Sequence, residues 1–89
     1  MTVALGPLDA ELTAAAREVI NATDALARAR GRRDRALAPY VNDAGMTAAA
    51  ASLHARAVLL NAGFTDLQVA GIGVSAETIR PAARHARTL

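Results

Sequence analysis

The apolar residues between positions 8 and 30 recur with helical spacing. Leu12, Val19 and Leu26 follow one another every seven residues. A second series with the same spacing lies between them and consists mostly of alanine: Leu8, Ala15, Ala22 and Ala29. Such an alternation of large and small residues lets two helices approach closely, as in a coiled coil or an antiparallel helix pair. We expect one apolar seam on a helix from Leu8, made of Leu8, Leu12, Ala15, Val19, Ala22 and Leu26. It pairs either with a second protein or with later helices of the same chain.

The start of the chain lacks this periodicity. Gly6-Pro7 marks residues 1–7 as a loose N-terminal arm. Asp9 then offers a carboxylate as the N-cap or in the first turn of the helix. The arm also lacks the basic start and apolar stretch of a signal peptide.

The helical segment 8–43 contains two breakers. Gly31 predicts a bend there or a new helix just after it, and Pro39 argues against an unbroken helix because it removes a backbone donor. Gly45 offers the left-handed conformation that commonly ends a helix. We therefore expect either one long N-terminal helix or a helical hairpin.

A central helix over residues 47–62 is predicted by its caps. Thr47 precedes an alanine-rich run, and Gly63 can end it with Phe64 packing back, as in the Schellman arrangement. Within the run, one face is expected to be lined by Leu53, Ala57 and Leu60.

Residues 65–87 carry the most specific signals in the chain. Thr65-Asp-Leu-Gln68 has the spacing of a capping box, in which the threonine and glutamine side chains satisfy each other's backbone amides. Gly73-Val74-Ser75 reads as a turn followed by the cap of a second helix. Three side chains of the first helix are expected to face inward: Leu67, Val69 and Ala70.

This order of signals resembles the broad bacterial and phage helix-turn-helix class over about residues 63–87. The resemblance implies that the second helix lies in a DNA major groove. It implies that Val74 and Ile79 face the core. It implies base-facing positions at Ala76, Glu77 and Arg80, where arginine pairs with guanine. It places four residues near the phosphate backbone: Thr65, Gln68, Thr78 and Arg84.

The chain departs from that class at two points. Only two residues separate Ala70 from Gly73, where the class has three, so the first helix should be short. Pro81 deprives the Glu77 carbonyl of its partner, which should kink the second helix or delay its start. The alternatives are a degenerate motif used for protein contact and a chance succession of capping signals.

Composition sets the fold class and the expected assembly. The 89 residues suit one domain, and 24 of them are alanine, with only two aromatic residues. Alanine is the best helix former, so we expect an all-α fold. A core so poor in large side chains is thin, and we expect a partner subunit, in a homodimer, to complete it. The chain has neither cysteine nor lysine, which fits a reducing cytoplasm and a GC-rich bacterial or phage genome.

Two basic clusters interrupt an otherwise acidic chain of net charge +2. Residues 28–35 carry five arginines against Asp34, and residues 75–89 carry three against Glu77. Arginines on phosphates release counterions, so the clusters suit double-stranded DNA, with Arg32 and Arg33 as further phosphate contacts. The alternative is a solvated arginine-rich helix face.

Little else suggests chemistry. His54 and His85 lie far apart with no cysteine nearby, so we expect no metal site, no cofactor and no enzyme. No apolar run reaches the roughly 18 residues that span a membrane, so no membrane contact is expected.

Two functions remain. The first is a small DNA-binding regulator that reads DNA with residues 75–87. The second is a helical interaction factor of bacterial or phage origin, which docks on a host protein through the Leu/Ala seam and does not bind DNA. A structural role in a phage particle stays open.

Overall fold

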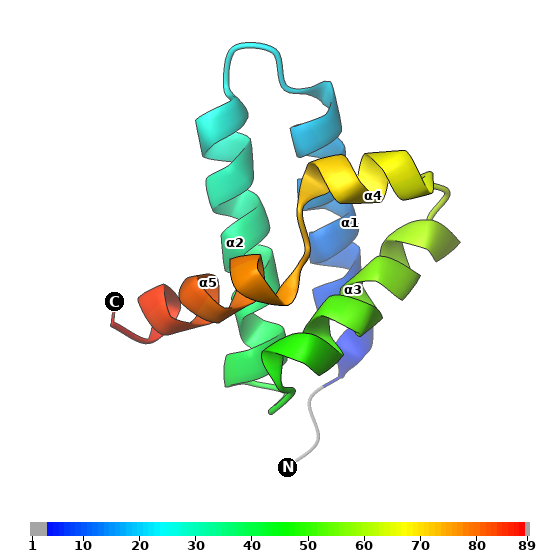
Figure 1. Ribbon diagram of the computed structural model, residues 1–89. Coiled ribbons are helices and arrows are strands. Elements are labelled where there is room, and N and C mark those ends of the chain that lie inside the picture. The colour runs from blue at the N-terminus through cyan, green and yellow to red at the C-terminus, as the bar shows by residue number, and fades with distance from the viewer. Residues whose placement is uncertain (1–3, 89) are drawn as a thin grey trace.

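The computed structural model describes residues 4–88, which form five helices and no strand (Figure 1). The all-α expectation is confirmed. The helices are α1 (Leu5–Asn21), α2 (Leu26–Asn42), α3 (Ala48–Asn61), α4 (Asp66–Ile72) and α5 (Ala76–Thr88). The predicted loose arm over 1–7 is wrong for its last three residues, which form the first turn of α1; residues 1–3 lie outside the described range.

The segment 8–43 is a helical hairpin, but its break is not at Gly31. The chain leaves helix at residues 22–25, and α1 and α2 pack side by side in opposite directions (Figure 1). Thr23 and Asp24 lie in this break, and their side chains compete for backbone hydrogen bonds, so they favour turns over helix interiors. Folding back here lets the apolar seam of α1 pack against α2.

Both predicted breakers lie inside α2. A glycine inside a helix lowers helix stability by about 1 kcal/mol relative to alanine. In α2 the packing against α1 and α5 offsets this cost at Gly31. Pro39 lies one turn before the end of α2, and its own carbonyl accepts from the Asp43 amide at 2.9 Å. The helix therefore ends only at Asn42, after the proline.

A single core joins the hairpin to the later helices. Its largest fully buried side chains are Tyr40, Leu12, Leu37, Leu59, Ile72 and Ile79. Alanines fill much of the remaining core, which lets helix backbones approach closely without large side chains between them. The core is thin, as expected, but it is assembled within one chain.

The predicted dimer or partner seam is part of this core. Leu12, Ala15 and Val19 are buried among the chain's own helices. The other three seam residues are partly buried against the same cluster: Leu8, Ala22 and Leu26. The prediction that this seam binds a second protein was therefore wrong, because α2 and its neighbours already cover it.

Helix α3 begins and ends as predicted, with a different inward face. Thr47 accepts from the Ala50 amide, and Gly63 ends the helix at φ 102°. The Gly63 and Phe64 amides donate to Leu60 and Leu59 in the Schellman pattern. The side packed on the core is Ala51, Ala55 and Leu59, whereas Leu53, Ala57 and Leu60 share the solvent-facing side.

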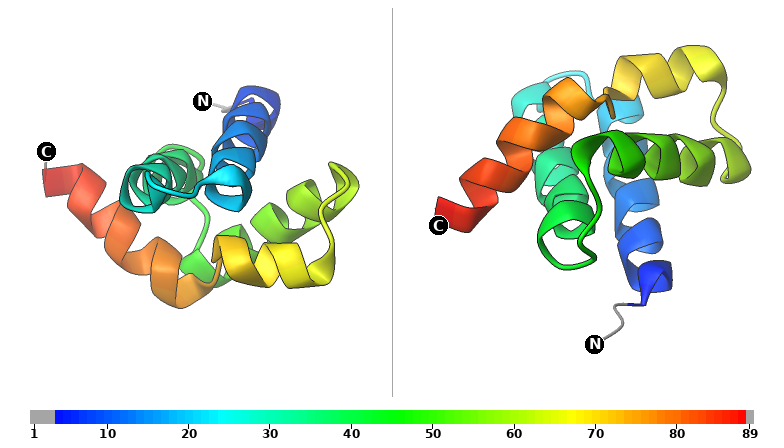
Figure 2. Two further views of the ribbon diagram at one scale, coloured as in Figure 1. Left: turned by 90° about the horizontal axis from the view of Figure 1, so that it is seen from above. Right: turned by 60° about the horizontal axis from the view of Figure 1, so that its bottom comes forward.

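The last three helices lie across the hairpin. α3 and α4 run in roughly opposite directions beside α1, and α5 crosses α2 and continues away from α4 (Figure 2). α5 packs chiefly on α2 and α3. Its outward side and its C-terminal end therefore face away from the rest of the molecule.

Candidate nucleic-acid interface

The helix before the turn is short and fully capped. Thr65 accepts from the Gln68 amide at 3.1 Å, and the Gln68 side chain accepts from the Thr65 amide at 2.9 Å, so the capping box is confirmed. α4 has seven residues, as the missing residue before Gly73 implied. Val69 faces inward as expected, but Leu67 and Ala70 are exposed, because a two-turn helix lying on the surface buries only one narrow side.

The turn takes the predicted form. Gly73 has φ 81°, which favours glycine, and Val74 is buried. The Ser75 hydroxyl accepts from the Thr78 amide at 3.3 Å and lies 3.2 Å from the Thr78 hydroxyl. Ser75 thus caps α5, as the sequence indicated.

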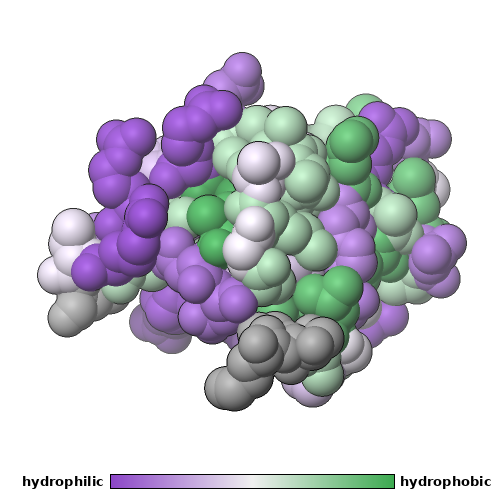
Figure 3. Space-filling model, turned by 90° about the horizontal axis from the view of Figure 1, so that it is seen from below, coloured by the Kyte–Doolittle hydropathy of each residue, from purple (hydrophilic) through white to green (hydrophobic). Residues whose placement is uncertain are grey.

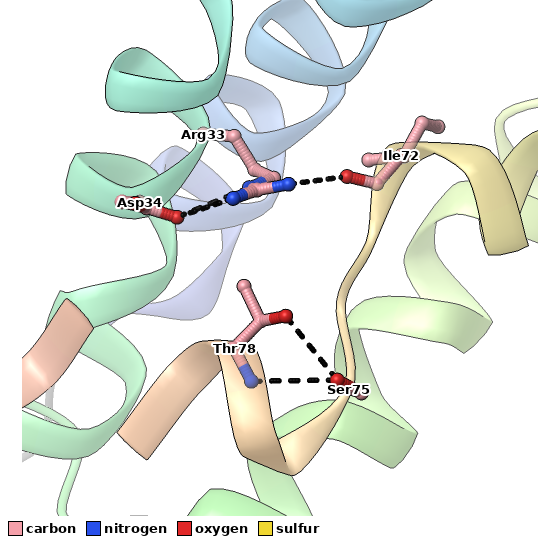
Figure 4. A network of polar contacts seen from close by, with 5 residues as sticks. All are labelled: Arg33, Asp34, Ile72, Ser75 and Thr78. Carbon is pink, nitrogen blue, oxygen red and sulfur yellow. Dashed lines mark hydrogen bonds and ion pairs between the residues drawn. The ribbon is translucent and has the colours of Figure 1, made fainter. Parts of the chain in front are cut away.

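Arg33 ties this turn to the hairpin. Its guanidinium donates to the Ile72 carbonyl at 2.8 Å and to Asp34 at 2.9 Å (Figure 4). The Ile72 carbonyl ends α4, where an unpaired acceptor and the negative end of the helix dipole both favour a cation. Arg33 therefore acts as a cap supplied by another helix.

Helix α5 is continuous through Pro81. Its thirteen residues run from Ala76 to Thr88, so the late start predicted from the proline does not occur. Pro81 and Glu77 both lie on the exposed side of the helix, where water can reach the carbonyl that lacks its amide partner. Ile79 faces inward as expected.

The outer side of α5 is a strip of unpaired charge, here called the α5 strip: Glu77, Arg80, Arg84 and Arg87. Their spacing of three and four residues places them on one side of the helix. All four are exposed, and none forms an ion pair with another residue between 4 and 88. The view from below shows hydrophilic side chains gathered on the side where α5 ends (Figure 3).

A groove between α5 and α2 adjoins the strip. Its volume is about 600 Å³, and Arg35 and His85 line it from the two helices. Thr78 also lines it, so this predicted phosphate contact faces the groove at the start of α5. The groove adds two further basic side chains next to α5.

The predicted DNA-contacting residues fall into separate groups. Glu77 and Arg80 are exposed on α5 and Ala76 is half-buried, while Arg84 lies in the same strip. Thr65 and Gln68 lie at the opposite end of α4 from the turn, bonded to each other. The structure therefore brings the α5 residues together and leaves the α4 pair apart.

Arg32 and Arg33 are both bonded to other residues of the chain. Arg32 bridges two carboxylates of α1, donating to Glu11 at 2.9 Å and to Glu18. The hydrogen bonds that Arg32 donates, to Glu11 first and to Glu18 second, raise the pKa of Arg32. Arg33 is 13% exposed and holds the end of α4. The Arg33 assignment is therefore wrong, because its guanidinium is mostly covered and holds a carbonyl of a helix distant in sequence. The Arg32 pairs are solvent-exposed, and its phosphate contact stays a prediction.

Sequence reasoning missed a cluster linking three helices. One oxygen of Asp9 accepts from the Tyr40 hydroxyl at 2.6 Å and lies 2.8 Å from Nε2 of His54. The two rings are tilted, with centroids 5.2 Å apart. Burial first, and then the bond to Asp9, raise the pKa of Tyr40. Asp9 is therefore a link between α1, α2 and α3 and not a helix cap, since α1 begins at Leu5.

The chain matches no protein-family model, no curated protein and no solved structure. Among residues 4–88, no group of three or more histidine and acidic residues is placed to hold a metal ion. Within the same range, none of the helices has the length and apolar character needed to cross a bilayer.

Proposed function

We propose that this protein binds double-stranded DNA with α5, as a small regulator of the helix-turn-helix type. The observation that carries the proposal is the α5 strip. An unbroken helix presents three arginines to solvent, and none of them forms an ion pair with a carboxylate among residues 4–88.

The dimensions of α5 suit the major groove. Thirteen residues make a helix about 20 Å long, and a groove about 12 Å wide admits one helix. Arg80 lies in the second turn, where a guanidinium reaches the O6 and N7 atoms of guanine. Glu77, one turn earlier, can accept from a cytosine amino group. Arg84 and Arg87 continue toward the flanking phosphates.

Support comes also from the way in which α5 is held. Ile79, Ala82 and Ala83 pack it on the body, and Arg33 fixes the preceding turn. Its outward side chains are therefore presented on a rigid element, which reduces the ordering cost of binding. Thr65 and Gln68 keep a hydroxyl hydrogen and an amide NH₂ to donate to a phosphate at the other end of α4.

A salt titration tests the proposal. Wild-type protein should bind mixed-sequence duplex DNA with an affinity that falls steeply with salt. For each tenfold rise in salt concentration, the logarithm of the association constant should fall by roughly 0.9 per phosphate contact. Arg84→Ala should lower that slope by roughly one contact. Arg80→Ala should in addition reduce discrimination between duplexes once a preferred sequence is found.

Arg28→Ala is the matched control. Arg28 is exposed on α2 and lines a hollow with residues of α1 and none of α5, so its loss removes the same charge away from α5. DNA binding that is absent, insensitive to salt, or weakened equally by Arg28→Ala and Arg84→Ala would contradict the proposal.

The host-protein alternative loses the surface on which it was based. The Leu/Ala seam of α1 is inside the core and is not accessible to a partner. The exposed side of α3 offers a different apolar surface, which supports a protein contact of another kind.

A further inference from the structure

The groove between α2 and α5 contains a cation without an ionic partner. Arg35 of α2 is exposed and forms no ion pair with another residue among 4–88. Its Nη1 atom lies 3.4 Å from the point that a Cβ at Gly31 would occupy, so the side chain folds back along α2 by one turn. Both residues line the groove. The Arg35 guanidinium is therefore held on the α2 side of the groove, with its charge open to an anion.

The α5 side of the groove carries hydrogen-bond donors. Thr78 and His85 line it and are seven residues apart, which places them on one line along the helix. An imidazole N–H can donate to an anion, and so can the Thr78 hydroxyl when the Ser75 hydroxyl, 3.2 Å away, donates to it. Donors from α5 therefore face the same space as the Arg35 guanidinium.

The carboxylate of Asp34 also lines the groove, but Arg33 balances its charge. Oδ1 of Asp34 accepts from Nε and Nη2 of Arg33 at 3.1 and 2.9 Å (Figure 4). This pair contributes no net charge to the lining. The charge of Arg35 remains, so the groove as a whole favours an anion.

The groove lies along one flank of the outward side of α5. Successive residues of a helix are about 100° apart, so the line of Thr78 and His85 is about 160° around α5 from the line of Arg80 and Arg87. Arg84 lies between the two lines. Helix α5 therefore presents polar or charged side chains on both flanks of its outward side.

A helix in the major groove has a phosphate strand on each flank. The major groove is about 12 Å wide, close to the diameter of a helix with its side chains. One strand would then pass Arg80 and Arg87. The other would pass Thr78 and His85, where the groove between α2 and α5 opens.

We infer that the groove between α2 and α5 holds one phosphate strand of the duplex, with Arg35 as its charged contact. The inference rests on the proposed DNA binding, because it concerns the strand that borders α5. It adds α2 to the DNA-contacting surface and fixes the flank of α5 on which α2 meets the DNA backbone.

Salt titrations with duplex DNA test the role of Arg35. Arg35→Ala should reduce the slope of the logarithm of the association constant against the logarithm of salt concentration by roughly 0.9, the value for one phosphate. Combining it with Arg84→Ala should reduce the slope by roughly 1.8, because the two arginines contact different phosphates. Arg35→Lys keeps the charge and should keep the wild-type slope. Circular dichroism should show an unchanged helix content for each variant, since residues 35 and 84 are exposed.

Arg28→Ala is again the matched control. Arg28 is exposed on the same helix as Arg35 but lines a hollow with residues of α1, so its loss should leave the slope unchanged. If Arg84→Ala lowers the slope while Arg35→Ala behaves like Arg28→Ala, the inference is overturned and the proposed function stands. A wild type that binds no duplex overturns both.

A titration without DNA separates a backbone phosphate from a free one. Inorganic phosphate should show no saturable binding to the wild type, because Arg35 supplies a single charge and a strand is held by several contacts together. Saturable binding of inorganic phosphate that Arg35→Ala abolishes would assign the groove to a free anion and overturn the inference.

Discussion

The two arginine clusters of this chain look alike in sequence and differ in structure. In the first cluster, Arg32 is held by two carboxylates of α1, and Arg33 holds the end of α4. In the second, the arginines of the α5 strip have no ionic partner among residues 4–88. Two members of the first cluster are bonded to other helices of the fold, and the second cluster is left without such partners on the surface.

The difference shows that a cluster of arginines in the sequence does not reveal whether those arginines are bonded within the fold or exposed. Arg32 finds its carboxylates 21 and 14 residues away, and Arg33 finds its carbonyl 39 residues away. Those partners become neighbours only when the hairpin closes and α4 folds over it. Arginines near the chain end meet no such partner, because α5 packs through Ile79 and alanines.

The largest effect on stability is expected at Arg33. Arg33→Met keeps the apolar stem and removes the donor to the Ile72 carbonyl, so the free energy of unfolding should fall by about 2 kcal/mol. Arg84→Met, in the α5 strip, should stay within about 0.5 kcal/mol of the wild type. Urea unfolding of both variants compares the clusters directly. Similar losses in the two would remove the distinction.

The stability of the protein at alkaline pH tests the contribution of Tyr40, which lies on α2 of the hairpin. Its pKa is raised in the folded state, so its contribution is complete below about pH 10 and is lost as pH rises above that value. The slope should approach about 1.4 kcal/mol per pH unit. Tyr40 is the only tyrosine in a chain without lysine or cysteine, so no other side chain titrates near pH 10.

Tyr40→Phe removes the hydroxyl and with it the pH dependence that Tyr40 gives to stability. The variant should be less stable at neutral pH by about 1 kcal/mol, because the bond to Asp9 is lost. Between pH 10 and 11 its stability should then be nearly flat while that of the wild type falls. Parallel curves for the two proteins would show that Tyr40 is not the titrating group.

The smallest effect is expected at Arg32. Its two ion pairs with α1 are solvent-exposed, so Arg32→Gln should lower the melting temperature only slightly, and only at low salt. Thermal melts with and without added salt measure this difference. A loss that persists at high salt would mean that Arg32 contributes by packing as well as by charge.

The features of the fold that depend on residues close together in the sequence could be predicted. Thr47, Thr65 and Ser75 each cap the helix that follows, and Gly73 takes the left-handed turn. These features depend on residues within four positions of one another. The continuous α5 also agrees with local helix propensity once the exposed position of Pro81 is known.

The parts that depend on distant partners could not be predicted. The inward side of α3 is one example, because an alanine-rich helix offers two apolar sides and only packing chooses between them. The cluster of Asp9, Tyr40 and His54 is another, since its members come from three helices. The break at residues 22–25 follows from the packing of the hairpin as much as from its own residues.

The contact between Arg33 and the turn also limits how this chain can vary. A side chain at position 73 would place its first carbon 3.0 Å from the Arg33 guanidinium, in a backbone conformation with φ 81°. Both conditions penalise replacement of Gly73, and a change at Arg33 would relieve only one of them. Among natural variants of this sequence, position 73 should therefore remain glycine even where position 33 changes.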